Sequence, residues 1–263
     1  MSTFQLNINE NLAVITLDRG RSNPINHQMV LELTACLQIL AMDDAVGGLI
    51  LTGKPGFFTS GVDLIEAYNY NEEQVRNFWT DFLNFQVALA SFKKPLVAAI
   101  SGHSPAGGCI MAICCDYRVM VEGEFIIGLN EIPVGIVVPD LVFSLYSFWL
   151  GQRIAYQSLL EGRLFKVNEA LNVGLVDEVC PAEQLMGIAE KKARAYMKLN
   201  KVTWSESKLN LRKNLLMQIK TDQSETLNTM LKQWWAPETR LGLEMMIQNL
   251  QAKKQHNKTN SYE

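Results

Sequence analysis

The segment that most constrains the fold of this chain is PLVAAISG, residues 95–102, together with the glycine-rich stretch SGHSPAGGCIMAICCD at residues 101–116. PLVAAISG is apolar over almost its whole length, which is typical of a parallel strand that is covered on both faces. Gly107 and Gly108 then form a turn, and CIMAICC predicts a short helix. A covered strand, a glycine turn and a helix in succession indicate an α/β fold built from βαβ units.

The remainder of the N-terminal part continues this alternation. Residues 4–8 and 12–17 alternate at period two, which predicts a hairpin. Asn26 precedes an amphipathic segment and suits the N-cap of a helix. The other predicted strands are 47–53, 117–121 and 124–128, and further helices are predicted at 72–92 and from about Leu141 onward.

The C-terminal third has a different pattern. A short helix and a strand are predicted between residues 162 and 183, and after Ala182 the helical period continues almost without interruption. We therefore predict an α/β core at residues 1–182 and a C-terminal helical region at residues 183–263.

Composition excludes several classes of function. The net charge of −3 gives no electrostatic reason to expect a nucleic acid or an anionic membrane as partner. The five cysteines are an odd number without C-x-x-C spacing, which suits a reducing compartment. The N-terminus lacks the pattern of a signal peptide, and no apolar run reaches the length that spans a bilayer. We therefore expect a cytoplasmic protein.

The glycine turn itself has three interpretations. Gly107 and Gly108 lie where a helix begins, so their N–H groups are free to face an oxyanion or a phosphate. Taken alone, a turn that lets strand and helix approach closely is the simpler interpretation. The third is a nucleophilic Ser104, because GHSPA approaches the G-x-S-x-G pattern.

The serine interpretation needs a histidine base, and the chain offers few candidates. His103 adjoins Ser104 in the sequence, and His256 lies in a polar tail. His27 follows the predicted N-cap of a helix, where capping or exposure explains it better. A serine esterase or thioesterase is therefore a weaker hypothesis.

Two further segments suggest chemistry. KPGFFTSGVDL, residues 54–64, repeats the order of strand, glycine and helix, so its N–H groups could meet the same oxygen as those of the first turn; alone, it is an ordinary loop in which Asp63 starts a helix. Glu131 lies in the almost uncharged stretch IIGLNEIPVGIVVP, where partial burial would raise its pKa toward values useful for acid–base catalysis. The simpler interpretation of Glu131 is an exposed loop residue.

Taken together and in order, these segments resemble the crotonase (enoyl-CoA hydratase/isomerase) superfamily. FTSGVDL resembles its first oxyanion segment, ISGHSPAGGCIMAICCDYRV the second, and GLNEIPVGIVVP the segment with the catalytic glutamate. EGRLFKVNEALNVGLVDEVCP and APETRLGLEMMIQ resemble later signatures. The resemblance implies a crotonase-like ββα spiral core with a C-terminal helical trimerisation region.

The resemblance also implies a site. The N–H groups of Val62 and Gly107 would form the oxyanion hole for an acyl-CoA thioester, and Glu131 would face the acyl chain. Asn130 would orient the carboxyl group or contact the thioester. The path of CoA would be lined by Ser60, Gly61, Val62, Asp63 and Leu64. Coenzyme A would be part of the substrate, and no separate cofactor or metal is expected.

Ile110 departs from the family pattern. Hydratases of this family carry a second catalytic glutamate at this position, and isoleucine cannot activate a water molecule. PAGGC, CDYR and GLNE closely resemble mitochondrial-type Δ3,Δ2-enoyl-CoA isomerases, which use one glutamate. The resemblance thus implies an isomerase that converts 3-enoyl-CoA to trans-2-enoyl-CoA in β-oxidation. The alternatives are a hydratase or related acyl-CoA reaction, the hydrolase using Ser104, and a non-catalytic CoA binder.

The C-terminal third leaves two questions open. The segment 191–220 contains nine Lys and Arg residues and only one acidic residue, Glu206. This excess of positive charge indicates a solvated helix face or, by resemblance, a contact with CoA phosphates. The aromatic residues 143, 146, 148 and 149 could shape the acyl pocket or belong to the core. Trp234, Trp235, Met245 and Met246 could anchor a subunit interface or be buried within one chain. By resemblance we expect a homotrimer or a dimer of trimers.

Overall fold

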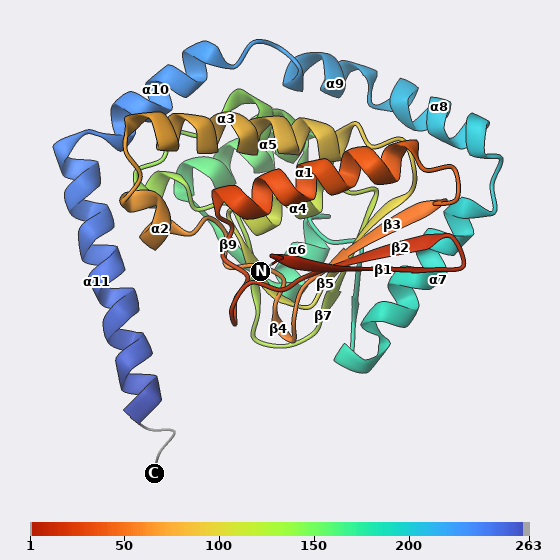
Figure 1. Ribbon diagram of the computed structural model, residues 1–263, viewed down its shortest axis with the longest axis horizontal. Helices are drawn as coiled ribbons and strands as arrows, with labels where there is room; N and C mark the ends of the chain where they lie inside the picture. Colours follow the sequence, from red (N-terminus) through yellow and green to blue (C-terminus); the bar gives the residue numbers. More distant parts are fainter. Residues whose placement is uncertain (1, 260–263) are drawn as a thin grey trace.

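A six-stranded sheet forms the centre of the molecule (Figure 1). The computed structural model describes residues 2–259, with side chains described as far as residue 252. The strand order is β1-β2-β3-β5-β7-β10; β1 and β2 are antiparallel and the other neighbours are parallel. The strands are β1 (Phe4–Asn9), β2 (Leu12–Leu17), β3 (Gly48–Thr52), β5 (Leu96–Ile100), β7 (Tyr117–Val121) and β10 (Glu178–Cys180).

Helices cover both faces of this sheet. On one face its apolar side chains share a core with α1 (His27–Met42), α3 (Glu72–Ala90), α4 (Gly107–Cys114) and α5 (Asp140–Glu161). On the other face, Leu185 and Ala189 of α7 (Leu185–Met197) pack against Ile50 and Val97. Every residue of β5 is buried. The α/β class and the double covering predicted from the apolar run at 95–102 are thus confirmed.

The sequence analysis missed a second, smaller sheet. It consists of β4 (Gly56–Phe57), β6 (Gly102–Pro105), β8 (Ile126–Gly128) and β9 (Leu164–Lys166), in that order. Three times the chain passes from a strand of the large sheet directly into one of the small sheet: β3 to β4, β5 to β6 and β7 to β8. Residues 103–105, expected to belong to the turn, therefore form a strand together with Gly102.

Gly102 makes this passage possible. A Cβ added there would lie 2.0 Å from the backbone carbon of Gly56, so any other residue would separate β4 from β6. The small sheet sets where the glycine turn before α4 and the segment after β8 lie. Its parallel strands bring the ends of β6 and β8 together, because Pro105 pairs with Gly128.

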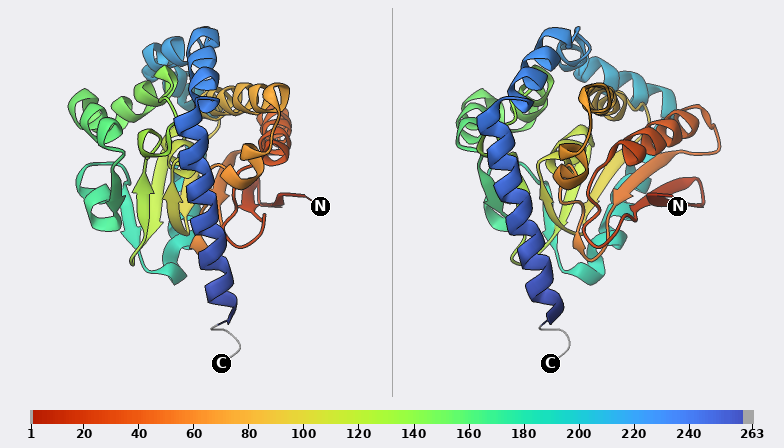
Figure 2. Two further views of the ribbon diagram at one scale, coloured as in Figure 1. Left: turned by 90° about the vertical axis from the view of Figure 1, so that its left-hand side faces the viewer. Right: turned by 60° about the vertical axis from the view of Figure 1, so that its left-hand side comes forward.

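The C-terminal helices arch over the α3 side of the molecule (Figure 1). They are α8 (Lys201–Leu211), α9 (Lys213–Ile219) and α10 (Ser224–Trp234), and α11 (Pro237–Thr259) then extends along one side beyond the sheets (Figure 2). Between β8 and α8 lie η1 (Ile132–Val134), α6 (Val167–Asn172) and η2 (Ala182–Gln184). The division at residue 182 stays a prediction, and residues 260–263 lie outside the described chain.

Two of the nine basic residues between 191 and 220 are not on a solvated face. Lys208 and Arg212 are 7% and 5% exposed and both contact Asp116, at 2.7 and 3.1 Å. Arg212 also donates to the carbonyls of Ala90 and Cys114, at the ends of α3 and α4. These two cations therefore fasten the α8–α9 segment to the core instead of facing solvent.

No helix within residues 2–259 combines the length and the apolar character that crossing a membrane would require. All five cysteines are free and buried.

Candidate functional site

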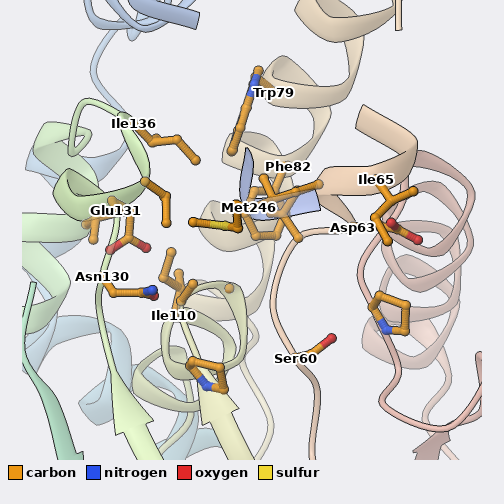
Figure 3. Close-up of a pocket in the computed structure, with 18 of the residues that line it drawn as sticks. Ser60, Asp63, Ile65, Trp79, Phe82, Ile110, Asn130, Glu131, Ile136 and Met246 are labelled. Carbon is orange, nitrogen blue, oxygen red and sulfur yellow. The ribbon is translucent and has the colours of Figure 1, made fainter. Parts of the chain in front are cut away.

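A cavity of about 540 Å³ opens between α3, α4, the segment after β8 and the C-terminal helices (Figure 3). Most of its lining is apolar. Glu131 and Asn130 lie on one side of the cavity, Ser60 and Asp63 lie on the other, and Ile110 lies between them (Figure 3). The three segments that the sequence analysis selected therefore meet in one place.

The glycine turn before α4 is held in an unusual backbone conformation. Ala106 has φ 47° and ψ −117°, which a residue with a side chain adopts only when its surroundings enforce it. The hydrogen bond from Ala106 N–H to Gly128 O, 2.8 Å long, supplies that constraint. Gly107 follows as the first residue of α4, and no hydrogen bond within the described chain uses its N–H. This donor is thus directed by the turn and left available.

The turn after β4 supplies a second donor. Ile25 bonds to Gly61 O and to Asp63 N, each at 2.8 Å, so the N–H of Val62 between them faces away from Ile25. No hydrogen bond of the described residues uses the Val62 N–H. The two turns touch, because a Cβ added to Gly61 would lie 3.5 Å from the nitrogen of Gly107. Val62 and Gly107 both line the cavity, so their unused N–H groups belong to the same part of its wall.

Ion pairs fix the position of the second turn. Asp63 caps α2 (Leu64–Tyr68) by accepting from Glu66 N–H and binds Arg19 at 2.7 Å. Arg19 also binds Glu66, at 2.6 Å. Asp63 lines the cavity together with Ser60 and Leu64, but its carboxylate is held by these contacts. Gly61 lies behind the lining, against Ala106.

Glu131 is a buried carboxyl group without a neutralising partner. It is 7% exposed, and its Oε2 has no hydrogen-bond partner among the described residues. Burial raises its pKa to about 7, and a hydrogen bond from its own backbone N–H only partly opposes this shift. Its backbone oxygen accepts from Val134 and Ile136, which fixes the turn. A carboxyl group with this pKa can both take and return a proton near neutral pH.

The cavity wall between Glu131 and the second turn is apolar at Ile110, the position where the sequence departs from the hydratase pattern. Ile110 lies one turn into α4, is 4% exposed and lines the cavity. Two carboxyl groups are found among the described lining residues, Asp63 and Glu131, and Arg19 holds the first. Within residues 2–259 no cluster of His, Cys, Asp and Glu has the arrangement of a metal site.

The structure does not assemble a serine hydrolase around Ser104. This serine is fully buried and is not part of the cavity lining. His103 accepts a hydrogen bond from Ile126 N–H, and His27 binds Asp81 at 2.7 Å. The side chain of His256 lies outside the described part. No described histidine therefore hydrogen-bonds to the Ser104 hydroxyl, and the elbow-like sequence around it belongs to strand β6.

Several lining residues were not expected from the sequence to lie at the site. They come from α3, the α5 side and the C-terminal helices: Trp79, Phe82, Leu83, Gln86, Ile136, Val142, Met230 and Met246. Gln86 could have been noticed, since it is a polar residue on the apolar stripe of α3. Tyr146 is buried in the core and Trp149 donates to Ile113 O, and neither lines the cavity.

The four residues considered for a subunit interface do not lie in the same environment. Trp234 is buried within the chain and packs edge-on against Trp79, whereas Met246 lines the cavity. Trp235 and Met245 are 36% and 53% exposed.

Comparison with known proteins gives a consistent result. Residues 7–256 match the model of the enoyl-CoA hydratase/isomerase family. The chain is 40% identical over 188 residues to enoyl-CoA delta isomerase 1, mitochondrial, of Mus musculus, and that alignment covers 71% of this chain and 64% of the mouse protein. The chain thus spans somewhat less than two thirds of this relative. Identity to the Homo sapiens counterpart is 29% over 245 residues, which cover 92% of this chain and 81% of the human protein.

Solved structures agree with these matches. The crystal structure of human mitochondrial Δ3-Δ2-enoyl-CoA isomerase superposes with a TM-score of 0.92 and 28% identity, covering 96% of this chain and 100% of the human one. The probable enoyl-CoA hydratase EchA3 of Mycobacterium tuberculosis superposes with a TM-score of 0.80 and 26% identity, covering 87% and 96%.

Proposed function

The chain belongs to the enoyl-CoA hydratase/isomerase family, and from this membership we propose that it is a Δ3,Δ2-enoyl-CoA isomerase. It converts 3-enoyl-CoA to trans-2-enoyl-CoA, the form that β-oxidation uses. The observation that carries this proposal is a lone, buried carboxyl group, Glu131, in one cavity with two unused backbone donors and an apolar Ile110. The names of the relatives support the same reaction.

The mechanism is a proton transfer between two carbons of one substrate. The carboxylate of Glu131 takes a proton from C2, and the electron pair of the broken C–H bond delocalises into a dienolate. The negative charge develops on the thioester oxygen, where the N–H groups of Val62 and Gly107 stabilise it. The loss of one such donor typically costs about 10²–10³ in rate. The carboxyl group then returns the proton to C4, so the carboxylate is regenerated and no other reactant is consumed.

The remaining site residues position the substrate. Ser60, Val62, Asp63 and Leu64 lie along the path proposed for CoA, and Gly61 lets this turn approach Ala106. Asn130 lies beside Glu131 (Figure 3). In the proposed complex its amide contacts the thioester or orients the carboxyl group. Coenzyme A is thus bound as part of the substrate.

The test is an assay with 3-octenoyl-CoA, following the absorbance of the conjugated thioester that forms. We expect turnover by the wild type and by Ser104→Ala, without release of free CoA. Release of CoA that stops in Ser104→Ala would favour the hydrolase instead, and binding of octanoyl-CoA without turnover of 3-octenoyl-CoA would favour a non-catalytic binder.

Hydration separates the isomerase from its nearest alternative. Because Ile110 cannot hold or activate a water molecule, crotonyl-CoA should be hydrated far more slowly than 3-octenoyl-CoA is isomerised. Equal rates of the two reactions would contradict the role given to Ile110.

We further propose a homotrimer or a dimer of trimers in the cytoplasm. Exposed apolar side chains on the C-terminal helices support an association of copies, among them Leu211, Met217 and Met245. Light scattering at several protein concentrations measures the oligomeric state, and a monomer at all concentrations would exclude the trimer.

A further inference from the structure

Gln86 is a polar side chain in an otherwise apolar part of the cavity wall. It lies on α3 among Trp79, Phe82 and Leu83, and it lines the cavity although its side chain is only 1% exposed. Its Oε1 has no hydrogen-bond partner among the described residues. An amide buried without its partners loses its hydration and gains nothing in exchange. Such a group calls for a partner that enters the cavity with the substrate.

The position of Gln86 along the cavity follows from the packing of α3 on α4. Phe82 lies beside the oxyanion turn, because a Cβ added to Gly107 would be 3.2 Å from its ring. Gln86 follows four residues later, about 6 Å further along α3. At that level its backbone oxygen accepts from the thiol of Cys114, the last residue of α4. For an acyl chain that runs along this wall from the oxyanion turn, Gln86 lies beyond the thioester, beside the distal part of the chain.

The chemistry of the amide selects one kind of substituent. A primary amide has a carbonyl acceptor and an N–H donor, and a hydroxyl group both donates and accepts. A hydroxyl therefore satisfies Gln86 whichever end of the amide faces it, whereas a keto group or a carboxylate can only accept. A plain alkyl chain satisfies neither end of the amide. Sites that hydrogen-bond a substrate hydroxyl discriminate strongly against the analogue that lacks it.

We propose that Gln86 is a specificity residue that adapts this cavity to acyl-CoA substrates with a hydroxyl group on the distal part of the acyl chain. This inference rests on the proposed acyl-CoA isomerase and goes further, because it names the class of chain.

Binding of saturated substrates tests the inference without requiring catalysis. Calorimetry compares octanoyl-CoA with its 6-, 7- and 8-hydroxy derivatives in the wild type and in Gln86→Leu. We expect at least one hydroxy derivative to bind the wild type about tenfold more tightly than octanoyl-CoA, and the preference to disappear in Gln86→Leu. Gln86→Met, which keeps the length of the side chain, serves as a second apolar variant if Gln86→Leu does not fold.

Gln218→Leu is the matched control, since it makes the same substitution at an exposed position on α9 that does not line the cavity. It should leave the ratio of the two affinities as in the wild type. Tighter binding of octanoyl-CoA than of every hydroxy derivative to the wild type, or the same ratio in the wild type and in Gln86→Leu, would overturn the inference. A water molecule that serves Gln86 for every substrate would give that second result.

The two proposals fail in different ways. An absence of isomerisation with 3-octenoyl-CoA, while the hydroxy derivatives bind preferentially through Gln86, would remove the isomerase and leave the specificity residue. Isomerisation of 3-octenoyl-CoA and of its hydroxy derivatives with ratios that Gln86→Leu does not change would remove the specificity residue and leave the isomerase.

Discussion

Two carboxyl groups of this protein are buried to a similar degree, yet their surroundings are opposite. The side chain of Asp116 is 10% exposed and is met by Lys208, by Arg212 and by the backbone N–H of Leu96. Glu131 is 7% exposed and faces an apolar cavity, with one oxygen unpartnered. The first joins the C-terminal helices to the core, and the second lies at the candidate active site.

The comparison shows that a buried carboxyl group has a different effect when it is paired with cations than when it is isolated. Removing one member of a buried ion pair leaves the others as uncompensated charges, so the group around Asp116 contributes mainly to architecture. An isolated buried carboxyl group costs stability when it ionises, and its raised pKa suits proton transfer instead. Burial lowers the pKa of Lys208 to about 8, and the charge of Asp116 opposes this shift. Without Asp116, the charged form of this buried lysine would therefore be less stable.

The largest expected effect is on turnover. Glu131→Gln removes the base and keeps the size of the side chain, so the rate with 3-octenoyl-CoA should fall by about 10³–10⁴. Conjugated thioester absorbance measures the loss. Glu73→Gln, at an exposed position on α3, is the control and should keep the wild-type rate. A Glu131→Gln variant with wild-type turnover would contradict the mechanism.

The next effect is on stability. Asp116→Asn leaves Lys208 and Arg212 buried without an anion and should lower the free energy of unfolding by about 3–5 kcal/mol. Urea denaturation measures this change. Asp44→Asn removes an exposed ion pair with Lys201 and should have no measurable effect. If both variants were equally stable, the α8–α9 segment would not depend on this group.

A third effect concerns the stability cost of the Glu131 carboxyl group. Its pKa of about 7 in the folded protein exceeds the ordinary 4.5, so the folded state holds its proton more tightly than the unfolded chain does. Wild-type stability should therefore fall, relative to Glu131→Gln, as pH rises from 4.5 to 7, by about 3 kcal/mol in total. Urea midpoints of both proteins across this range measure the difference. A constant difference would indicate that Glu131 is not buried in solution.

The smallest effect is the pH dependence of turnover. Since the carboxylate is the active form, kcat/KM should level off above pH 7 and fall about tenfold for each unit well below it. The wild-type profile with 3-octenoyl-CoA measures the midpoint. Glu73→Gln should have the same midpoint, whereas a wild-type midpoint near the ordinary 4.5 would be inconsistent with an isolated base.

Much of the fold could be predicted from local pattern. The apolar run at 95–102 and the period-two hairpin predicted a covered sheet, and Asn26 predicted the start of α1, where it accepts from Met29 N–H. The small sheet could not be predicted in this way. The strand predicted at 124–128 contains β8, but β4 has only two residues, too few for a periodic signal, and no local pattern shows which strands pair. Its existence depends on Gly56 and Gly102 meeting across a distance in sequence.

The sequence by itself determined the α/β class, the two glycine turns and the candidacy of Glu131, because turns and apolar surroundings are encoded within a few neighbouring residues. Only the tertiary structure decided that Val62 and Gly107 face one cavity, that Ser104 is buried and that Lys208 and Arg212 serve Asp116. Whether a residue is buried or paired with a charge depends on segments that lie far apart in the chain. For the same reason, the sequence shows Gln86 only as a glutamine in a predicted helix. Only the tertiary structure shows that its amide oxygen is unpartnered and that it lies in the cavity wall.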